Sequence, residues 1–214
     1  MGATIAFWSD CISYAVVASP LFVIVSFATI GFGLKYIDDA FDEDRFSKTT
    51  AKLLAPILVL LWISVSLFDP VSATVLFAIL IAVLLSGKVD NRIFKLSALA
   101  LIAGVVLTQY AHFSWVPLAV LTVLGVTDEK GNDYVDLHET GGLREFFFAH
   151  RCSMKLGALS LCIASFLPWL YLVAFLAFDT AYELIKLIDY LRVPAIDTKV
   201  WRLPLALILL GKFK

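Results

Sequence analysis

Five acidic residues follow closely on the first long apolar segment of the chain. Residues 11–34 carry no charge, and just beyond them lie Asp38, Asp39, Asp42, Glu43 and Asp44. If a helix continues through this cluster, Asp38 and Asp42 share one face, and such a like-charge pair costs about 0.2–0.5 kcal/mol. Carboxylates are also unfavourable at the negative end of a helix dipole. A divalent cation reverses both effects, so the cluster predicts a site for Mg²⁺ or Mn²⁺ together with a phosphate group.

A second acidic region lies in residues 128–155, with basic side chains close to both regions. Two sets of carboxylates can hold metal ions that bridge a diphosphate, while Arg and Lys neutralise its outer oxygens. The predicted metal ligands are Asp38, Asp39, Asp42, Asp133 and Asp136. The predicted diphosphate-binding residues are Arg45, Lys48, Arg144 and Lys155. The preference for Lys and Arg in cytoplasmic loops explains their positions equally well. His138 and His150 are weaker candidates for ligation or acid-base chemistry.

Composition indicates that these residues belong to an integral membrane protein. Of 214 residues, 61% are hydrophobic and 16% are charged, and the mean hydropathy is +0.91. A net charge of −1 and the lack of a nucleic-acid-binding motif exclude nucleic acid as an expected partner. The three cysteines form no CxxC pair, so neither a disulfide framework nor a zinc site is predicted.

The uncharged segments predict an all-α bundle of about six to seven transmembrane helices in a single membrane domain, residues 1–214. The expected spans are 11–34, 53–68, 71–87, two within 96–127, and 156–178, with 203–211 left open as a short crossing. Pro20 is expected to kink the first span, which we expect to be retained rather than cleaved. We expect a tight hairpin at Asp69 and a turn near 111–115. Residues 179–202 are predicted to form an amphipathic segment at the interface.

Lys and Arg concentrate in three segments, 35–52, 88–95 and 128–155, and are missing from the two intervening turns. The positive-inside rule therefore predicts that all three segments are cytoplasmic and that the N-terminus is outside. Segments 35–52 and 128–155 are expected to be acidic loops on the same face of the membrane. The expected partners are the lipid bilayer, an isoprenoid or lipid-linked substrate and, as an option, a second copy of the chain.

The first acidic cluster resembles a known family signature. DDAFDEDRFSK resembles NDxxDxxxD of the UbiA-type intramembrane prenyltransferases, with Asp39 and Asp42 at its first two aspartates and Asp38 in place of Asn. Asp44 matches the last aspartate only if two residues are deleted. TDEKGNDYVD is similar to the family's second acidic motif, so the resemblance covers about residues 31–155. The chain is shorter than members of that family by about two helices. It implies a magnesium-dependent transferase in which diphosphate leaves an isoprenoid and an acceptor captures the carbocation.

Two further resemblances and one other class of function compete with this hypothesis. Residues 33–54 resemble the DD-containing loop of polyprenyl-phosphate sugar-phosphate transferases. Residues 136–155, with DLH and HRCSMK, resemble membrane-bound metal-dependent hydrolases with DxDH and HRxxTH motifs. The alternative from another class is a membrane cation channel, transporter or non-enzymatic assembly subunit whose acidic loops concentrate cations. Few ionisable residues lie inside the predicted spans, which counts against an ion-coupled pump.

Overall fold

The computed structural model describes residues 19–89, 91–108, 112–138 and 142–192. Within these ranges the chain is α-helical and contains no strand, which confirms the expected all-α class. The helices are α2 (Pro20–Asp42), α3 (Lys48–Phe68), α4 (Pro70–Leu85), α5 (Arg92–Thr108), α6 (Trp115–His138), α7 (Leu143–Ala149), α8 (Cys152–Ile163) and α9 (Trp169–Arg192). The part of the first span before residue 19 and the segment 203–211 lie outside the described residues.

Side-chain caps fix the starts of the first three described helices. The hydroxyl of Ser19 accepts a hydrogen bond from the Phe22 backbone N–H at 3.2 Å, and Ser47 caps α3 in the same way. Asp69 ends α3 and caps α4, with Pro70 at the first helical position, which confirms the predicted hairpin. Pro20 was expected to kink a span; instead it begins α2, because its fixed φ and missing N–H suit the first turn.

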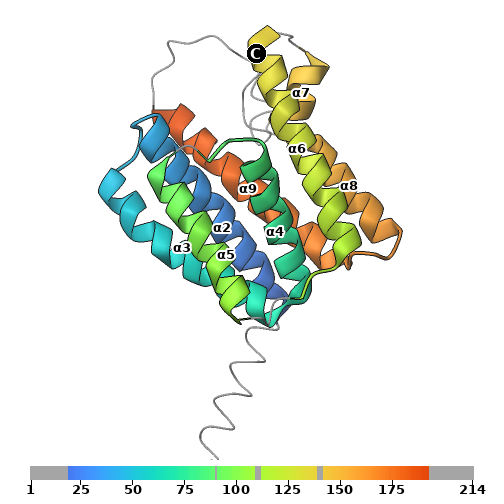
Figure 1. Cartoon of the computed structure of the whole chain (residues 1–214). Helices are drawn as coiled ribbons and strands as arrows, with labels where there is room; N and C mark the ends of the chain where they lie inside the picture. The colour runs from blue at the N-terminus through green and yellow to red at the C-terminus, as the bar shows by residue number, and fades with distance from the viewer. Residues whose placement is uncertain (1–18, 90, 109–111, 139–141, 193–214) are drawn as a thin grey trace, which may run out of the picture.

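The long helices alternate in direction along the chain, as Figure 1 shows, with the short α7 at one end. The connection 43–47, residues 86–89 after α4, and α7 with the turn at 150–151 lie at one end of the bundle, and the connections at Asp69, 112–114 and 164–168 lie at the other. The described parts of the three charged segments therefore meet at the same end, as the placement of Lys and Arg predicted, and the side of the membrane that this end faces stays a prediction. The turn predicted near 111–115 is confirmed for its described residues, because 112–114 are not helical and α6 begins at Trp115, whereas 109–111 lie outside the described residues.

Helices α2 and α9 pack side by side and run parallel, although they are far apart in the sequence. A Cβ atom added at Gly31 would lie 2.2 Å from the backbone oxygen of Phe178, so only glycine allows this approach. Four residues further along both helices, the Lys35 ammonium lies 5.5 Å from the ring centre of Tyr182. This pairing brings the C-terminal half of α9 to the charged end of α2.

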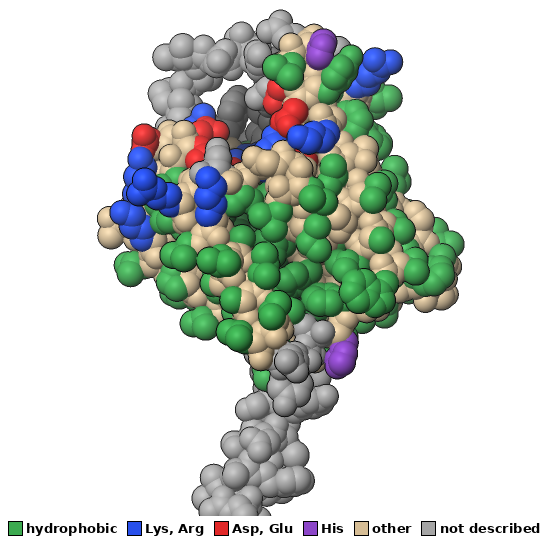
Figure 2. Space-filling model, viewed as in Figure 1, with side chains coloured by type: hydrophobic (Ala, Val, Ile, Leu, Met, Phe, Trp, Pro, Cys, Tyr) green, Lys and Arg blue, Asp and Glu red, His purple; other side chains and the backbone are tan. Residues whose placement is uncertain are grey.

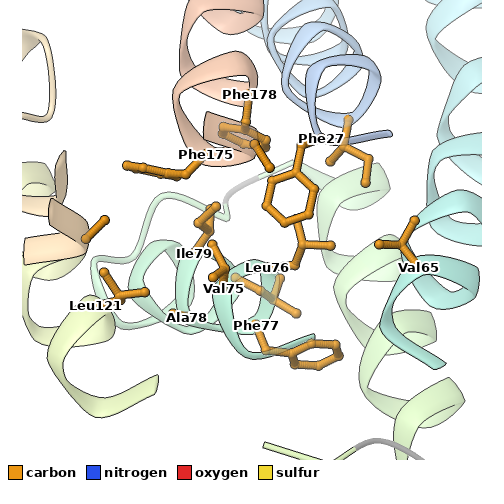
Figure 3. Close-up of a cluster of buried hydrophobic side chains, with 14 of the residues drawn as sticks. Phe27, Val65, Val75, Leu76, Phe77, Ala78, Ile79, Leu121, Phe175 and Phe178 are labelled. Carbon is orange, nitrogen blue, oxygen red and sulfur yellow. The ribbon is translucent and has the colours of Figure 1, made fainter. Parts of the chain in front are cut away.

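The main core takes buried side chains from α2, α3, α4 and α9, with further members from α5, α6 and α8. Figure 3 shows Phe27, Val65, Leu76 and Phe178 pointing toward one another from these four helices, and all four side chains are buried. Helix α4 is buried along most of its length, whereas α2 and α3 bury one face and expose the other. The core therefore fills the middle of the bundle.

The predicted loop at residues 128–155 is largely helical. Helix α6 continues through Asp128, Asp133 and Asp136 to His138, and α7 and the start of α8 follow. The helix persists because its charged side chains find partners: Lys88 pairs with Asp133, and Arg151 pairs with Glu129 at 3.0 Å. The loop predicted at 35–52 is likewise reduced to residues 43–47.

The last predicted span, 156–178, is divided between two helices. Helix α8 ends at Ile163, the chain turns through Ser165 at φ 61°, and α9 begins at Trp169 after Pro168. Residues 179–192 of the predicted amphipathic segment continue α9 without a break, and residues 193–202 lie outside the described part. The proline and the left-handed residue stop α8 after twelve residues.

The surface separates apolar and charged side chains. Figure 2 shows Lys, Arg, Asp and Glu gathered at one end, with hydrophobic side chains over most of the remaining visible face. Exposed apolar residues include Leu60, Leu99 and Leu107. By length and composition α2 and α3 can each cross a membrane, whereas α4 and α8 are apolar but shorter. These two helices give weak support for membrane association, and the count of six to seven spans stays a prediction.

Candidate functional site

A cavity of about 780 Å³ opens among the helices at the charged end of the bundle. Every described helix except α8 contributes lining residues, as do the connection 43–47, residues 87–89 and the turn between α7 and α8. Both predicted acidic regions reach this cavity: Asp38, Asp39 and Asp42 line it from α2, and Asp136 lines it from α6. The helical arrangement thus brings together two segments that are almost one hundred residues apart.

On α2, helical spacing places Lys35 beside two of the predicted metal ligands. The Lys35 ammonium lies 2.8 Å from Asp38 and 2.7 Å from Asp39, at spacings of three and four residues. The Asp39 side chain is buried, so this ion pair is shielded from solvent. The like-charge penalty expected from the sequence is therefore offset within the helix, by a lysine one turn earlier.

On α6, Asp128 has a structural role that the sequence did not reveal. Its carboxylate accepts hydrogen bonds from the backbone N–H groups of Ser153 at 3.0 Å and Met154 at 2.8 Å, which are in the first turn of α8. These N–H groups have no partner within their own helix, and the residue before α8, Arg151, gives no side-chain cap. Asp128 therefore caps α8 from a neighbouring helix and fixes the turn that carries His150 and Arg151.

Three basic side chains surround the ring of Tyr182 on the wall of the cavity. Arg151 lies 4.6 Å from the ring centre, Lys186 5.4 Å and Lys35 5.5 Å. Arg151 also pairs with Glu129, and its backbone adopts the left-handed conformation at φ 49°. Cations stack favourably on aromatic faces, so Tyr182 holds three positive charges from α2, α9 and the α7–α8 turn close together.

His150 is the most unusual polar residue in the lining. Only 3% of it is exposed, and neither ring nitrogen has a hydrogen-bond partner among the residues that the structure describes. Its Nδ1 lies 4.0 Å from an oxygen of Glu183, and Phe146 packs edge-on at 4.6 Å between ring centroids. Burial lowers the pKa of His150 below its usual 6.5, against an opposing effect of Glu183, so the imidazole is neutral at pH 7.

The inner part of the cavity is apolar. Trp62, Ile79, Leu80 and Phe178 line it and also belong to the main core. Helix α3 begins at the charged end with Lys48, and Trp62 lies about 21 Å further along its axis, at 1.5 Å per residue. Beyond these residues the side chains shown in Figure 3 are packed together, so the core closes the inner end of the cavity.

The predicted diphosphate-binding residues are placed differently from one another. Arg45 lines the cavity. Lys48 is not among the lining residues and pairs with Asp44, and Arg144 is exposed on α7 outside the lining. Lys155 is also outside the lining: it forms an ion pair of 2.5 Å with the buried carboxylate of Asp179 and donates to the His150 carbonyl. Asp133, a predicted metal ligand, lies outside the lining and pairs with Lys88.

Sequence reasoning missed the contribution of α9. Tyr182, Glu183 and Lys186 lie in a segment interpreted as an interfacial amphipathic helix, yet all three line the cavity. Tyr182 and Lys186 are four residues apart and so share one helical face. That polar face was the available signal, but the sequence did not show which helix it would meet.

The described residues do not form a metal site from protein ligands alone. No group of three or more His, Cys, Asp or Glu side chains in the described ranges is placed to hold an ion. The lining does contain more Asp and Glu than Lys and Arg, and Mg²⁺ often uses only one or two carboxylates together with substrate phosphates. The predicted ion therefore fits these residues only as an ion shared with a bound phosphate.

Comparison with known proteins gives no relative for this arrangement. No protein-family model matches the chain, and neither a curated protein nor a solved structure matches it. The resemblance to intramembrane prenyltransferases therefore stays a prediction that depends on the residues of the two acidic regions.

Proposed function

We propose that the protein is a multi-pass membrane enzyme that binds an isoprenoid diphosphate, or a related lipid-linked phosphate, and transfers the lipid group with the help of a divalent cation. The observation that carries this proposal is the cavity, which is charged at its mouth and apolar at its inner end. Its volume of about 780 Å³ lies in the usual range for small-molecule sites. An amphiphile with a phosphate head and a hydrocarbon chain matches both ends.

In this proposal the two ends of the cavity divide the work of binding. Lys35, Arg151 and Lys186 attract the phosphate oxygens, and the hydrocarbon chain lies against apolar residues such as Leu58 and Trp62. Magnesium, bound with the phosphate near Asp42 and Asp136, would supply charge neutralisation for the leaving diphosphate. The closed inner end limits access of water to the chain, and the aromatic face of Trp62 favours a developing carbocation.

A binding experiment separates the head and the chain of the ligand. Calorimetry with purified protein in detergent should show binding of farnesyl diphosphate in Mg²⁺ and much weaker binding in EDTA. Ala98→Trp fills the apolar part of the cavity, so it should weaken the binding of farnesyl diphosphate while inorganic diphosphate still binds. Ala119→Trp, on an exposed face of α6, is the matched control. No binding of either diphosphate by the wild type would refute the proposal.

A second experiment tests whether the two acidic regions act together. Asp42→Asn and Asp136→Asn should each weaken Mg²⁺-dependent diphosphate binding, and the double variant should be little worse than either, because residues that act as a unit are non-additive. Asp133→Asn is the control, since Asp133 lies outside the lining. Additive effects within about 0.5 kcal/mol would instead indicate independent sites.

The hydrolase alternative is favoured by one observation: His150 lines the cavity and has no hydrogen-bond partner in the described ranges. In that reaction water would accept the lipid group, and the product would be a free lipid alcohol. Product analysis with radiolabelled farnesyl diphosphate distinguishes the two reactions: farnesol alone indicates hydrolysis, whereas farnesyl transfer to an added alcohol indicates a transferase.

A further inference from the structure

Among the described residues, the buried imidazole of His150 finds none of the hydrogen-bond partners that a buried polar group normally has. Leaving such a group unsatisfied costs about 1–3 kcal/mol, and most buried polar atoms in proteins are paired. Within the described part of the chain, both ring nitrogens of His150 are without a hydrogen-bond partner, and the residue lines the cavity. The arrangement therefore points to a bound molecule as the missing partner.

The surroundings of His150 are those of a proton acceptor. Glu183 presents one oxygen to Nδ1 at 4.0 Å and binds Lys186 through its other oxygen at 2.7 Å. The charged groups facing the ring are Glu183, Lys186 and Asp179 from α9 and Lys155 from α8, while α7 contributes the uncharged Phe146. Lys155 is paired with Asp179, so Glu183 is the carboxylate positioned to stabilise a protonated imidazole. A base held beside an orienting carboxylate is a recurrent arrangement in catalysis.

We propose that His150 is the general base that takes the proton from a hydroxyl-bearing acceptor bound in the cavity, with Glu183 as its positioning residue. This inference rests on the proposed function. The acceptor oxygen forms a bond to the first carbon of the lipid, and the carbon–oxygen bond to the diphosphate breaks with its electron pair going to the diphosphate. The acceptor proton moves to His150, which later returns it to solvent. The acceptor class is an alcohol, a phenol or water.

The first test is nuclear magnetic resonance of the whole protein labelled in histidine. The chain has only three histidines, and the exposed His112 and His138 serve as internal references. Glu183→Gln should lower the pKa of His150, because the carboxylate raises it. Glu43→Gln, which alters a carboxylate paired with Arg45, is the control. An unchanged His150 titration in Glu183→Gln would overturn the pairing.

The second test measures diphosphate release from farnesyl diphosphate, with Mg²⁺ and excess alcohol, as a function of pH. The wild-type kcat/KM should rise with pH and then level off. His150→Gln should lower kcat/KM about 10²–10⁴-fold and remove its dependence on pH. Farnesyl diphosphate should still bind to this variant. An unchanged rate and pH profile would overturn the role of His150 and leave the proposed function standing. No metal-dependent release by the wild type with any alcohol or water would overturn both.

Discussion

Replacing Asp128 tests whether the second acidic region is in part a structural element rather than a solvated loop. Asp128 is 1% exposed and accepts the N–H groups of Ser153 and Met154. In Asp128→Ala the buried N–H group of Met154 and the part-buried N–H group of Ser153 both lose their acceptor. Each loss costs about 1–3 kcal/mol, and loss of a helix N-cap typically costs about 1 kcal/mol. With partial rehydration we expect a total loss of about 2–4 kcal/mol.

Thermal unfolding of the purified protein in detergent measures this loss. For a chain of this size, 1 kcal/mol corresponds to about 2–4 °C, so a loss of about 3 kcal/mol lowers the midpoint by roughly 6–12 °C. Asp128→Asn keeps one carbonyl acceptor and should fall between the wild type and Asp128→Ala. Asp136→Ala, at an exposed position on the same helix, should change stability by less than about 0.5 kcal/mol.

The order of the three variants decides the outcome. If Asp128→Ala unfolds at the wild-type midpoint, Asp128 does not cap α8, and the turn carrying His150 and Arg151 is held by other contacts. If Asp136→Ala destabilises as strongly as Asp128→Ala, the loss reflects helix α6 in general rather than the cap.

Three further predictions follow from packing, protonation and topology. Gly31→Ala forces α2 away from the α9 backbone, so it should lower the free energy of unfolding, measured by thermal unfolding, by about 1–3 kcal/mol. The control is Gly104→Ala, whose added methyl group meets only the movable end of a side chain and should leave the free energy of unfolding nearly unchanged. The pKa of His150 is lowered in the folded state, so below about pH 6.5 the unfolded chain binds more protons than the folded chain. The free energy of unfolding should therefore fall as the pH drops through about 6.5, and this fall should be smaller in His150→Gln. For topology, single cysteines are placed in a cysteine-free background and labelled with a membrane-impermeant reagent in oriented vesicles. Positions 49, 89 and 143 should label from one side of the membrane and position 114 from the other. If positions 49, 89 and 143 label from different sides, they do not lie at a common charged end.

The cavity also limits the channel alternative. A channel needs a continuous path between the two ends of the bundle, whereas the inner end of the cavity meets the packed side chains of Phe27, Val65 and Leu76. Liposome flux measurements check this directly. Steady cation flux through the wild type would show that the core opens, and it would favour the channel over the proposed enzyme.

The sequence by itself determined the features that depend on neighbouring residues. Apolar segments of helical length predicted the all-α class, and Asp69 with Pro70 predicted the hairpin between α3 and α4. The concentration of Lys and Arg in three segments also predicted, through the positive-inside rule, that the acidic regions share one end. The Lys35 pairs with Asp38 and Asp39 follow from helical spacing within one segment.

Only the tertiary structure decided which of these residues share a site. The parallel packing of α2 against α9 brings Tyr182 to Lys35, and it depends on the absence of a side chain at Gly31. A carboxylate in a polar sequence can bind a metal, cap a helix or pair with lysine, and the local pattern is the same in each case. Asp128 caps α8, and Asp133 pairs with Lys88, because the folded chain places those partners within reach. The choice of partner depends on contacts between distant segments, which no local spacing contains.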